Sequence, residues 1–258
     1  MDRVVLTIAG SDPSGGAGVQ ADLQTFAHFN VIGLSAITAI TAQNEELVLA
    51  IHPTPADILT QQLSTACKGK NLDAIKIGMV ATQANVKAIA WFLHHTPVKN
   101  VVIDPVLHSS SGTPLLETKA YAIYRQQLLP LASVITPNLM EAGVLAGMQV
   151  ASLDTMRRAA ETIYQETARL SGGKERPLTV LIKGGHLEGD AVDVLYDGEK
   201  YFSFPAKRIP GPSPRGTGCR FSSAIAACLA LGDDISTAIK KAKEYLADYI
   251  SRTNKWGN

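Results

Sequence analysis

The sequence predicts an α/β fold, with a central and mostly parallel sheet covered by helices on both faces. Three observations lead to this prediction. Continuous apolar runs recur along the chain, segments with apolar residues at helical spacing separate them, and polar residues collect where the apolar runs end. Strands that alternate with helices of about a dozen residues are typical of parallel sheets.

In the first half of the chain each predicted element has a simple signature. Residues 4–8 are continuously apolar apart from one threonine and stop at Gly10, as expected of a strand buried on both faces. A loop rich in turn formers follows, and Val19, Leu23 and Phe26 then recur at helical spacing. The next elements are expected, in order, as strand 34–40, short strand 48–51, helix 55–68, strand 74–80, helix 83–95 and strand 98–102.

The second half continues the alternation and adds a hairpin. Its predicted elements are helix 118–129, strand 132–136, helices 138–146 and 153–170, strand 180–182, strands 192–196 and 201–204, and helices 221–231 and 235–250. Asp197-Gly198 is a favourable turn between the two hairpin strands. We see no internal repeat, low-complexity tract or linker, and therefore predict a single domain, 1–258.

Composition and charge exclude several classes of protein. Of 258 residues, 46% are apolar and 18% are charged, with a net charge of +1, so neither extended disorder nor a basic nucleic-acid-binding face is expected. No apolar run approaches the roughly 20 residues that span a bilayer. The cysteines Cys67, Cys219 and Cys228 form no CxxC pair, which disfavours a zinc site or a disulfide framework. We predict a soluble, cytoplasmic protein with no nucleic-acid or membrane partner.

Ligands of open α/β sheets bind beyond the carboxyl ends of the strands. The polar residues at these ends are Ser11, Asp12, Gln43, Asp104, Asn138, Glu141 and Lys183. No G-x-x-x-x-G-K-[ST] motif occurs, so a P-loop nucleotide site is not expected. Gly15-Gly16-Ala17-Gly18 does not fit the dinucleotide fingerprint, so hydride transfer is disfavoured. The pattern favours phosphoryl transfer, which needs an anion cradle, a cation, metal-binding carboxylates and a base.

The anion cradle is predicted at Gly216-Thr217-Gly218-Cys219, where a turn passes into a helix. Free backbone N–H groups at a helix N-terminus bind anions such as phosphate. The same field lowers the pKa of a cysteine, which makes Cys219 a candidate base for an attacking hydroxyl. The alternative is a glycine-rich turn that only positions a core helix.

The other candidates lie at different strand ends. Lys183 is a candidate phosphate contact, and Asp104 and Glu141 are candidate Mg²⁺ ligands. An exposed lysine and ordinary capping charges are the alternatives. Asp22 accepts hydrogen bonds, whereas Gln43 both donates and accepts them, so the pair suits the edge of an amino-substituted heteroaromatic ring. As isolated residues, both types are also common on plain surfaces.

Motifs along nearly the whole chain resemble the hydroxymethylpyrimidine/phosphomethylpyrimidine kinases of thiamine biosynthesis. They are Thr7-Ile8-Ala9-Gly10-Ser11-Asp12-Pro13-Ser14-Gly15-Gly16-Ala17-Gly18, Gln20-Ala21-Asp22-Leu23, Thr38-Ala39-Ile40-Thr41-Ala42-Gln43-Asn44, Lys76-Ile77-Gly78-Met79, Asp104-Pro105-Val106, Thr136-Pro137-Asn138-Leu139-Met140-Glu141-Ala142, Lys183-Gly184-Gly185-His186 and Gly216-Thr217-Gly218-Cys219. The resemblance implies a ribokinase-like three-layer α/β/α fold. It also implies ATP- and Mg²⁺-dependent phosphorylation of 4-amino-5-hydroxymethyl-2-methylpyrimidine, then of its monophosphate, by a homodimer.

The resemblance also implies roles for individual residues. Asp22 and Gln43 would bind the pyrimidine ring, and the residues around it would be Ala17, Met79 and Val106 as walls and Gly10 as floor. ATP-Mg²⁺ would lie across Asn138, Glu141, Lys183 and the turn of Thr217, Gly218 and Cys219. Cys219 stands where the sugar kinases of this superfamily carry an aspartate base.

Two alternatives and several departures from the family pattern remain open. A pyridoxal/pyridoxine kinase is the nearest alternative, because relatives with the same Gly-Thr-Gly-Cys turn act on that ring. A catalytically silent pyrimidine-binding protein is the alternative from another class. Arg215 and Arg220 flank the cradle where uncharged residues or histidine are more usual, and they suit a phosphorylated substrate, nucleotide contacts or plain surface positions. Glu45 and Glu46 follow Gln43-Asn44 where threonine or serine is more usual, and His108 and His186 follow predicted strand ends.

Overall fold

A computed structural model describes residues 2–256 of the chain, apart from 45, 110, 173–176, 186, 188 and 213. Within this part, nine strands form one sheet in the order β3-β2-β1-β4-β5-β6-β7-β8-β9. The strands are β1 (Val4–Ser11), β2 (Ile32–Gln43), β3 (Val48–Pro53), β4 (Ala74–Ile77), β5 (Asn100–Ile103), β6 (Val134–Ile135), β7 (Thr179–Ile182), β8 (Ala191–Tyr196) and β9 (Tyr201–Ala206). The six strands from β2 to β7 pair in parallel, and β3, β8 and β9 add antiparallel edges, which confirms the mostly parallel sheet.

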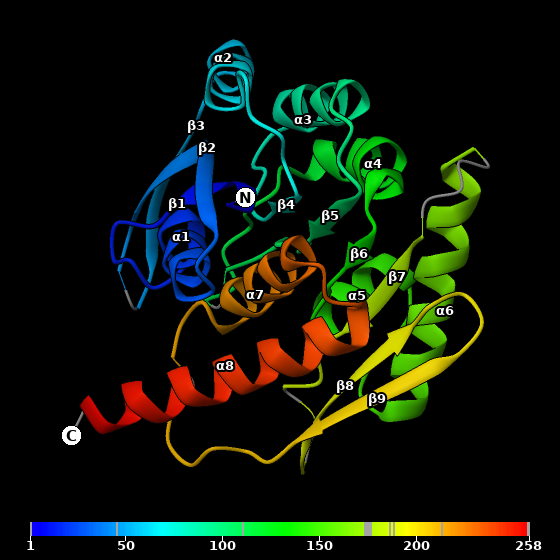
Figure 1. Cartoon of the computed structure of the whole chain (residues 1–258). Coiled ribbons are helices and arrows are strands. Elements are labelled where there is room, and N and C mark those ends of the chain that lie inside the picture. Colours follow the sequence, from blue (N-terminus) through cyan, green and yellow to red (C-terminus); the bar gives the residue numbers. More distant parts are fainter. Residues whose placement is uncertain are drawn as a thin grey trace.

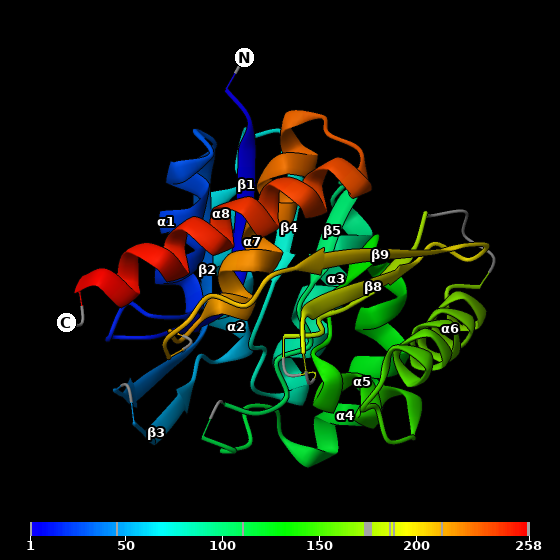
Figure 2. The ribbon, with the colours of Figure 1, turned by 90° about the horizontal axis from the view of Figure 1, so that it is seen from below.

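Helices cover both faces of this sheet (Figures 1 and 2). The long helices are α1 (Gly18–His28), α2 (Ala56–Ala66), α3 (Gln83–His95), α5 (Leu139–Ala146), α6 (Leu153–Leu170), α7 (Thr217–Leu231) and α8 (Ile235–Trp256). Because side chains alternate along a strand, Leu6 and Ile8 pack into one core with α2, α3, α5 and α6. Val5 points the other way, into a second core with α1, α7 and α8. The fold is therefore the predicted three-layer α/β/α arrangement.

The predicted helix 118–129 is irregular in the structure. It is a succession of short helical turns: Thr118–Ala120, α4 (Tyr121–Ile123), a π-helical turn Tyr124–Leu128 and a final turn Leu129–Leu131. Pro130 lies in the last turn and has no N–H for a helical hydrogen bond, so a regular helix does not continue through it. The hydrophobic period revealed the buried face but not these changes of helical pitch.

Helix α7 starts earlier than predicted, at Thr217 rather than at 221, and its small residues allow it to lie close to the sheet. Most of its side chains are buried, including Ser222, Ser223 and the alanines that follow them. Its first turn therefore points at the carboxyl ends of the central strands. The predicted cradle and the predicted strand-end residues consequently meet at one edge of the sheet.

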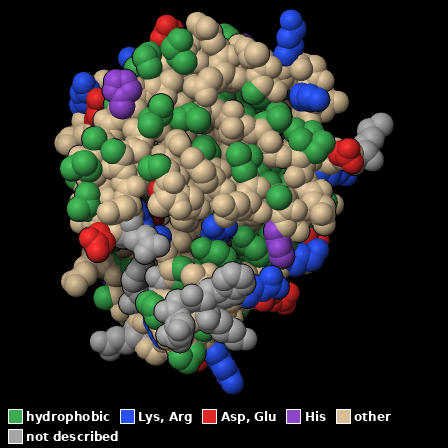
Figure 3. All heavy atoms as spheres, turned by 90° about the vertical axis from the view of Figure 1, so that its left-hand side faces the viewer, with side chains coloured by type: hydrophobic (Ala, Val, Ile, Leu, Met, Phe, Trp, Pro, Cys, Tyr) green, Lys and Arg blue, Asp and Glu red, His purple; other side chains and the backbone are tan. Residues whose placement is uncertain are grey.

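In the described part of the chain, no helix is both long and apolar enough to cross a membrane. The edge formed by β2 and β3 carries exposed apolar side chains, among them Leu49, which is 79% exposed. Seen from this side, apolar side chains are spread across the face (Figure 3). The assignment of the whole chain, 1–258, to one domain stays a prediction.

Candidate active site

A cavity of about 930 Å³ opens at the carboxyl ends of the parallel strands. It is lined by the ends of β1, β2 and β4, by the segments after β5 and β7, by α5 and by the first turn of α7. The predicted site residues that line it are Gly10, Ala17, Gln43, Met79, Asp104, Val106, Asn138, Glu141, Lys183, Gly216, Thr217, Gly218 and Cys219. Asp22 is the one predicted residue outside this lining.

The loop after β1 is held in shape by Asp12. Its carboxylate accepts hydrogen bonds from the N–H and hydroxyl groups of Ser14, at 2.9 and 2.7 Å, and from the Ala17 N–H at 2.8 Å. Burial acts to raise the pKa of Asp12, but these bonds and one from Gln43 outweigh burial and lower it. The sequence identified Asp12 as a polar strand-end residue but not as the group that shapes the loop.

Two glycine-rich loops touch at the site. Gly216 has φ 72° and precedes α7, and a Cβ there would lie 2.0 Å from the carbonyl oxygen of Gly16. Gly18 has φ 60°, and a Cβ there would lie 2.3 Å from the carbonyl oxygen of Gly10. Neither backbone conformation nor this close approach suits a larger residue. The contact fixes the predicted cradle against the loop after β1.

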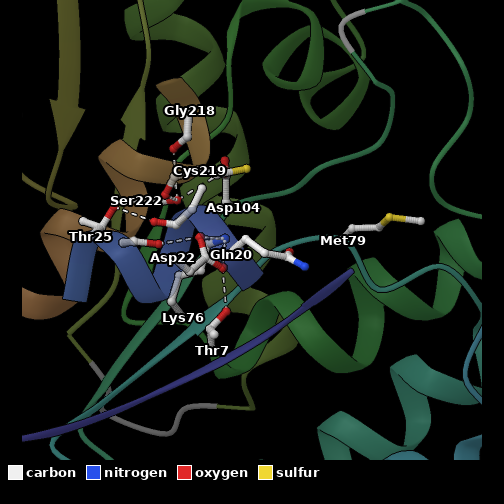
Figure 4. Close-up of polar contacts among 12 residues, drawn as sticks. Thr7, Gln20, Asp22, Thr25, Lys76, Met79, Asp104, Gly218, Cys219 and Ser222 are labelled. Atoms are coloured by element: carbon white, nitrogen blue, oxygen red, sulfur yellow. Dashed lines mark hydrogen bonds and ion pairs between the residues drawn. The ribbon is translucent and has the colours of Figure 1, made fainter. Parts of the chain in front are cut away.

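Asp22, predicted to bind a ring, lies in an internal ion pair and outside the cavity lining. Its side chain is fully buried, and both carboxylate oxygens lie 2.9 Å from Nζ of Lys76 on β4. Thr7 and Ser223 donate hydrogen bonds to the same carboxylate at 2.6 and 2.7 Å. Figure 4 shows this cluster beside the turn that carries Cys219. In the described part of the chain, every hydrogen bond of Asp22 is therefore internal, which argues against the expected contact with a ring.

A second ion pair lines the cavity itself. Lys183 Nζ lies 2.6 Å from Asp104, which also accepts hydrogen bonds from Thr136 and Ser222 at 3.2 Å each. Burial acts to lower the pKa of Lys183, but the carboxylates of Asp104 and Glu141 outweigh it and raise the pKa. Lys183 is therefore a fixed cation at the strand ends. It suits the predicted role of a phosphate contact.

Asn138 and Glu141 form a capping box at the start of α5. The Asn138 side chain accepts the Glu141 N–H at 2.9 Å, and the Glu141 carboxylate accepts the Asn138 N–H at 2.8 Å. Burial raises the pKa of Glu141 to about 7, although Lys183 acts to lower it. This carboxylate lines the cavity, and a further cation near it would stabilise its charged form.

Cys219 lines the cavity, but its predicted low pKa is wrong in direction. Burial raises the pKa of its thiol above the ordinary value, with smaller opposing contributions from Lys76 and from the Gly18 N–H. The sequence argument considered the field of α7 alone. It had no information on how far the surrounding residues would exclude water from the sulfur.

Gln43 and Met79, which were expected around a ring, both line the cavity. Gly10 lies against Met79, since a Cβ at Gly10 would be 2.9 Å from the Met79 sulfur. Arg215 reaches across from the loop before α7 and donates a hydrogen bond to the Gln43 side chain at 3.4 Å. It also donates to the carbonyl oxygen of Asn44. These contacts join the end of β2 to the cradle loop.

The two arginines beside the cradle have different places. Arg215 lines the cavity, whereas Arg220 is buried, lies 4.1 Å from the ring centre of Tyr249 and donates to Gln24. Arg220 therefore connects α7 to α8 and α1 rather than contacting a ligand. His108 lines the cavity, and the positions of His186 and Glu45 lie outside the described residues.

This fold, with a ligand cavity at the strand ends and a glycine turn at the start of α7, is that of the ribokinase-like kinases. The chain belongs to the phosphomethylpyrimidine kinase family, whose model matches residues 12–258. It is 42% identical to a hydroxymethylpyrimidine/phosphomethylpyrimidine kinase of Rhizobium meliloti, over 99% of this chain and 93% of that protein.

Solved structures agree with this assignment. A phosphomethylpyrimidine kinase from Clostridium difficile 630 superposes with a TM-score of 0.83 at 38% identity, covering 96% of this chain and 100% of that one. An ADP complex of a Bacillus subtilis pyridoxal kinase also gives a TM-score of 0.83, at 40% identity over 95% of this chain and 90% of that one. The fold and the kinase class are thus shared by enzymes with two kinds of ring substrate.

Proposed function

We propose that this kinase transfers the γ-phosphoryl group of ATP to the hydroxymethyl group of 4-amino-5-hydroxymethyl-2-methylpyrimidine, and then to the resulting monophosphate. The observation that carries the proposal is one cavity lined by two chemically different groups of residues. Met79 and Val106 pack together and, with Gln43, suit a flat ring. Lys183 and Gly218 of the glycine turn lie close together and suit phosphates. Family membership and the named relatives support the same reaction.

The residues that line the cavity have complementary tasks. The N–H groups at the start of α7 bind the transferring phosphoryl group, and the Lys183 ammonium offsets its charge. The Cys219 thiolate takes the proton of the substrate hydroxyl, whose oxygen then forms a bond to the γ-phosphorus while the bond to ADP breaks. Gln43 orients the ring, and Arg215 limits the orientations open to Gln43.

The residues of the cavity also fit Mg²⁺. Among the described residues, no group of three or more histidine, cysteine or acidic side chains forms a metal site. Mg²⁺ in kinases is held by one or two carboxylates together with nucleotide phosphates and water, so one suitable carboxylate is sufficient. Glu141 is that carboxylate, since burial without a full counter-charge raises its pKa to about 7. When bound, Mg²⁺ would neutralise charge on the phosphates of ATP.

Asp104, the second predicted metal ligand, has a different place in the proposal. Its carboxylate lies 2.6 Å from Lys183 and accepts further bonds from Thr136 and Ser222. A carboxylate with these partners is best suited to fix the lysine. Any contact with Mg²⁺ would then run through water.

The test is a coupled assay of ADP release with four acceptors: hydroxymethylpyrimidine, its monophosphate, pyridoxine and pyridoxal. We expect turnover on both pyrimidines and less on the pyridine compounds. Turnover on the pyridines alone would establish the pyridoxal kinase alternative, which the 40% identity to the Bacillus subtilis enzyme keeps in view. Silence on all four by a folded, ATP-binding protein would support the silent binding protein instead. Cys219→Ala serves as the inactive control.

The homodimer and the cytoplasmic location remain part of this proposal. Support for the dimer comes from the β2–β3 edge, where Ile40 is 60% exposed and Leu49 is 79% exposed. Burying such side chains against a second copy removes apolar area from water. Sedimentation equilibrium checks the dimer. A Leu49→Lys variant that sediments like the native protein would argue against this edge as the interface.

A further inference from the structure

The Cys219 thiol must lose its proton before it can accept one from a substrate, yet its surroundings oppose this. Burial is the largest influence and raises its pKa. The start of α7 was the only stabilising feature visible in the sequence. Two further groups act to lower the pKa of Cys219: the backbone N–H of Gly18 at the start of α1 and the ammonium group of Lys76.

Lys76 is an unusual residue for the middle of a parallel sheet. It lies on β4, its side chain is 0% exposed, and both Lys76 and Cys219 belong to residues that border the cavity. An isolated ammonium in such a place would lose its proton. Burial does act to lower the pKa of Lys76, but Asp22 outweighs burial and raises it, so the group stays charged.

Asp22 is itself fixed on every side. It accepts bonds from Lys76, from Thr7 on β1 and from Ser223, which lies on α7 one turn after Cys219. The ammonium is therefore held at a constant place relative to the helix that carries the thiol. Rotation of Lys76 toward solvent would leave a buried carboxylate without a counter-ion.

Four charged groups influence the pKa of Cys219, and each comes from a different part of the sheet or its helices. Lys76 lies on β4, Asp22 on α1, Asp104 after β5 and Lys183 after β7. The two aspartates disfavour a thiolate, but each is bonded to one of the lysines. Among the charged groups, Lys76 has the strongest effect on Cys219 and favours its ionisation.

We propose that Lys76 is a positioning residue for the reaction: its buried ammonium, fixed by Asp22, stabilises the thiolate of Cys219. Asp22, predicted from sequence to touch the ring, then acts two steps away from the substrate. The effect on turnover rests on the function proposed above. The effect on the thiol does not, because it can be measured without any substrate.

The experiment measures alkylation of Cys219 by iodoacetamide between pH 6 and 10, with the modified peptide quantified by mass spectrometry. The main variant is Lys76→Met with Asp22→Asn, which removes both buried charges and keeps the volume similar. We expect the midpoint of the alkylation profile to rise by about one pH unit, and the rate at pH 7 to fall about tenfold. Lys76→Arg keeps the charge and should restore much of the native profile.

A matched control removes a lysine from a pair that is remote from the thiol. Lys241→Met breaks the surface pair with Asp233 and should leave the alkylation midpoint unchanged. A midpoint within about 0.2 pH units of native in the folded double variant would overturn the proposal. An equal shift of the midpoint in the Lys241 variant would also overturn the proposal, because loss of any lysine would then have the same effect on the thiol.

Kinetics separate this role from a merely structural one. At pH 7 the double variant should lose about tenfold in kcat with little change in KM, and should regain activity as the pH rises. A structural defect would lower activity at every pH and would overturn the proposal. If the thiol profile shifts but no acceptor is turned over even by the native protein, the proposed function fails and the inference about Lys76 stands.

Discussion

Two lysine–aspartate pairs flank the start of α7, and they differ in one respect. In each, a lysine from a central strand or its end meets a carboxylate within 3 Å: Lys76 with Asp22 at 2.9 Å, and Lys183 with Asp104 at 2.6 Å. Two adjacent serines of α7 each donate to one of the carboxylates. The first pair is fully buried, whereas the Lys183 side chain is 14% exposed and faces the cavity.

The difference teaches how one kind of pair can serve two purposes. A fully buried pair cannot exchange its partner for a ligand, so its effects are on stability and on the field at neighbouring groups. A pair at a cavity wall keeps part of its charge available to an incoming anion. Burial, rather than residue type, therefore decides which lysine is open to the phosphate that we propose at this site.

The sharpest way to break this comparison is to remove Lys76 alone. Lys76→Met leaves the Asp22 carboxylate buried without a counter-ion, and we expect the free energy of unfolding to fall by about 3–5 kcal/mol. Urea denaturation measures the change. Adding Asp22→Asn should recover most of the loss. A single variant as stable as the double one would show that the buried charge is not the cause.

Lys183→Met tests the cavity-facing pair. We expect kcat/KM for the acceptor to fall by about 10²–10³, the usual effect of losing one group that stabilises transition-state charge. The loss of stability should be smaller than for Lys76→Met, because water can reach this pair. Steady-state ADP release and urea denaturation on the same preparation provide both values. A variant that loses more stability than activity would reverse the roles assigned to the two pairs.

The pH dependence of stability tests the carboxylate next to the cavity-facing pair. Burial raises the pKa of Glu141 from 4.5 to about 7, so the folded protein keeps this proton while the unfolded chain loses it. Glu141 therefore makes stability decrease as pH rises from about 4.5 to about 7, with no further change above. Thermal unfolding with EDTA and without nucleotide should show a shallower decrease in Glu141→Gln. Parallel curves for the two proteins would contradict the assignment.

The smallest expected effect concerns access to Lys183. Gly218 and Lys183 both line the cavity, and a Cβ at Gly218 would lie 3.2 Å from Lys183 Nζ. Gly218→Ala should raise the KM for ATP by about threefold to tenfold, since it crowds the proposed phosphate site without removing a charge. Gly185→Ala is the matched control, because a Cβ there meets nothing within 4 Å. Equal KM values in both variants would place the phosphates elsewhere.

Much of the fold followed from the sequence because its signals are local. Apolar runs and helical periods placed the strands and most helices. The rule that ligands lie at strand ends brought together Asp104, Glu141 and Lys183, which all line the cavity. The irregular segment after Thr118 was missed because a hydrophobic period does not report helical pitch.

The predictions about the site that were not supported depend on contacts between distant segments of the chain. Asp22 was assigned to the ring because its carboxylate accepts hydrogen bonds and because the family resemblance implies this role. Neither argument considered Lys76, which forms an ion pair with Asp22 in the fold. The thiol of Cys219 was expected to ionise easily because a helix N-terminus is visible in sequence and burial is not. A lysine in an apolar strand that ends next to a glycine is the signal that could have revealed the ion pair.

The joining of the two ends of the chain at α7 has a consequence for biosynthesis. The bond from Ser223 to Asp22 spans 201 positions, and the bond from Arg215 to Gln43 spans 172. While the ribosome is still making the last quarter of the protein, the first strands can pair, but the thiol and its turn do not yet exist. Such a high contact order slows folding. The active site can therefore form only after translation is nearly complete. A chain whose synthesis stops early would contain part of the sheet but no phosphate site.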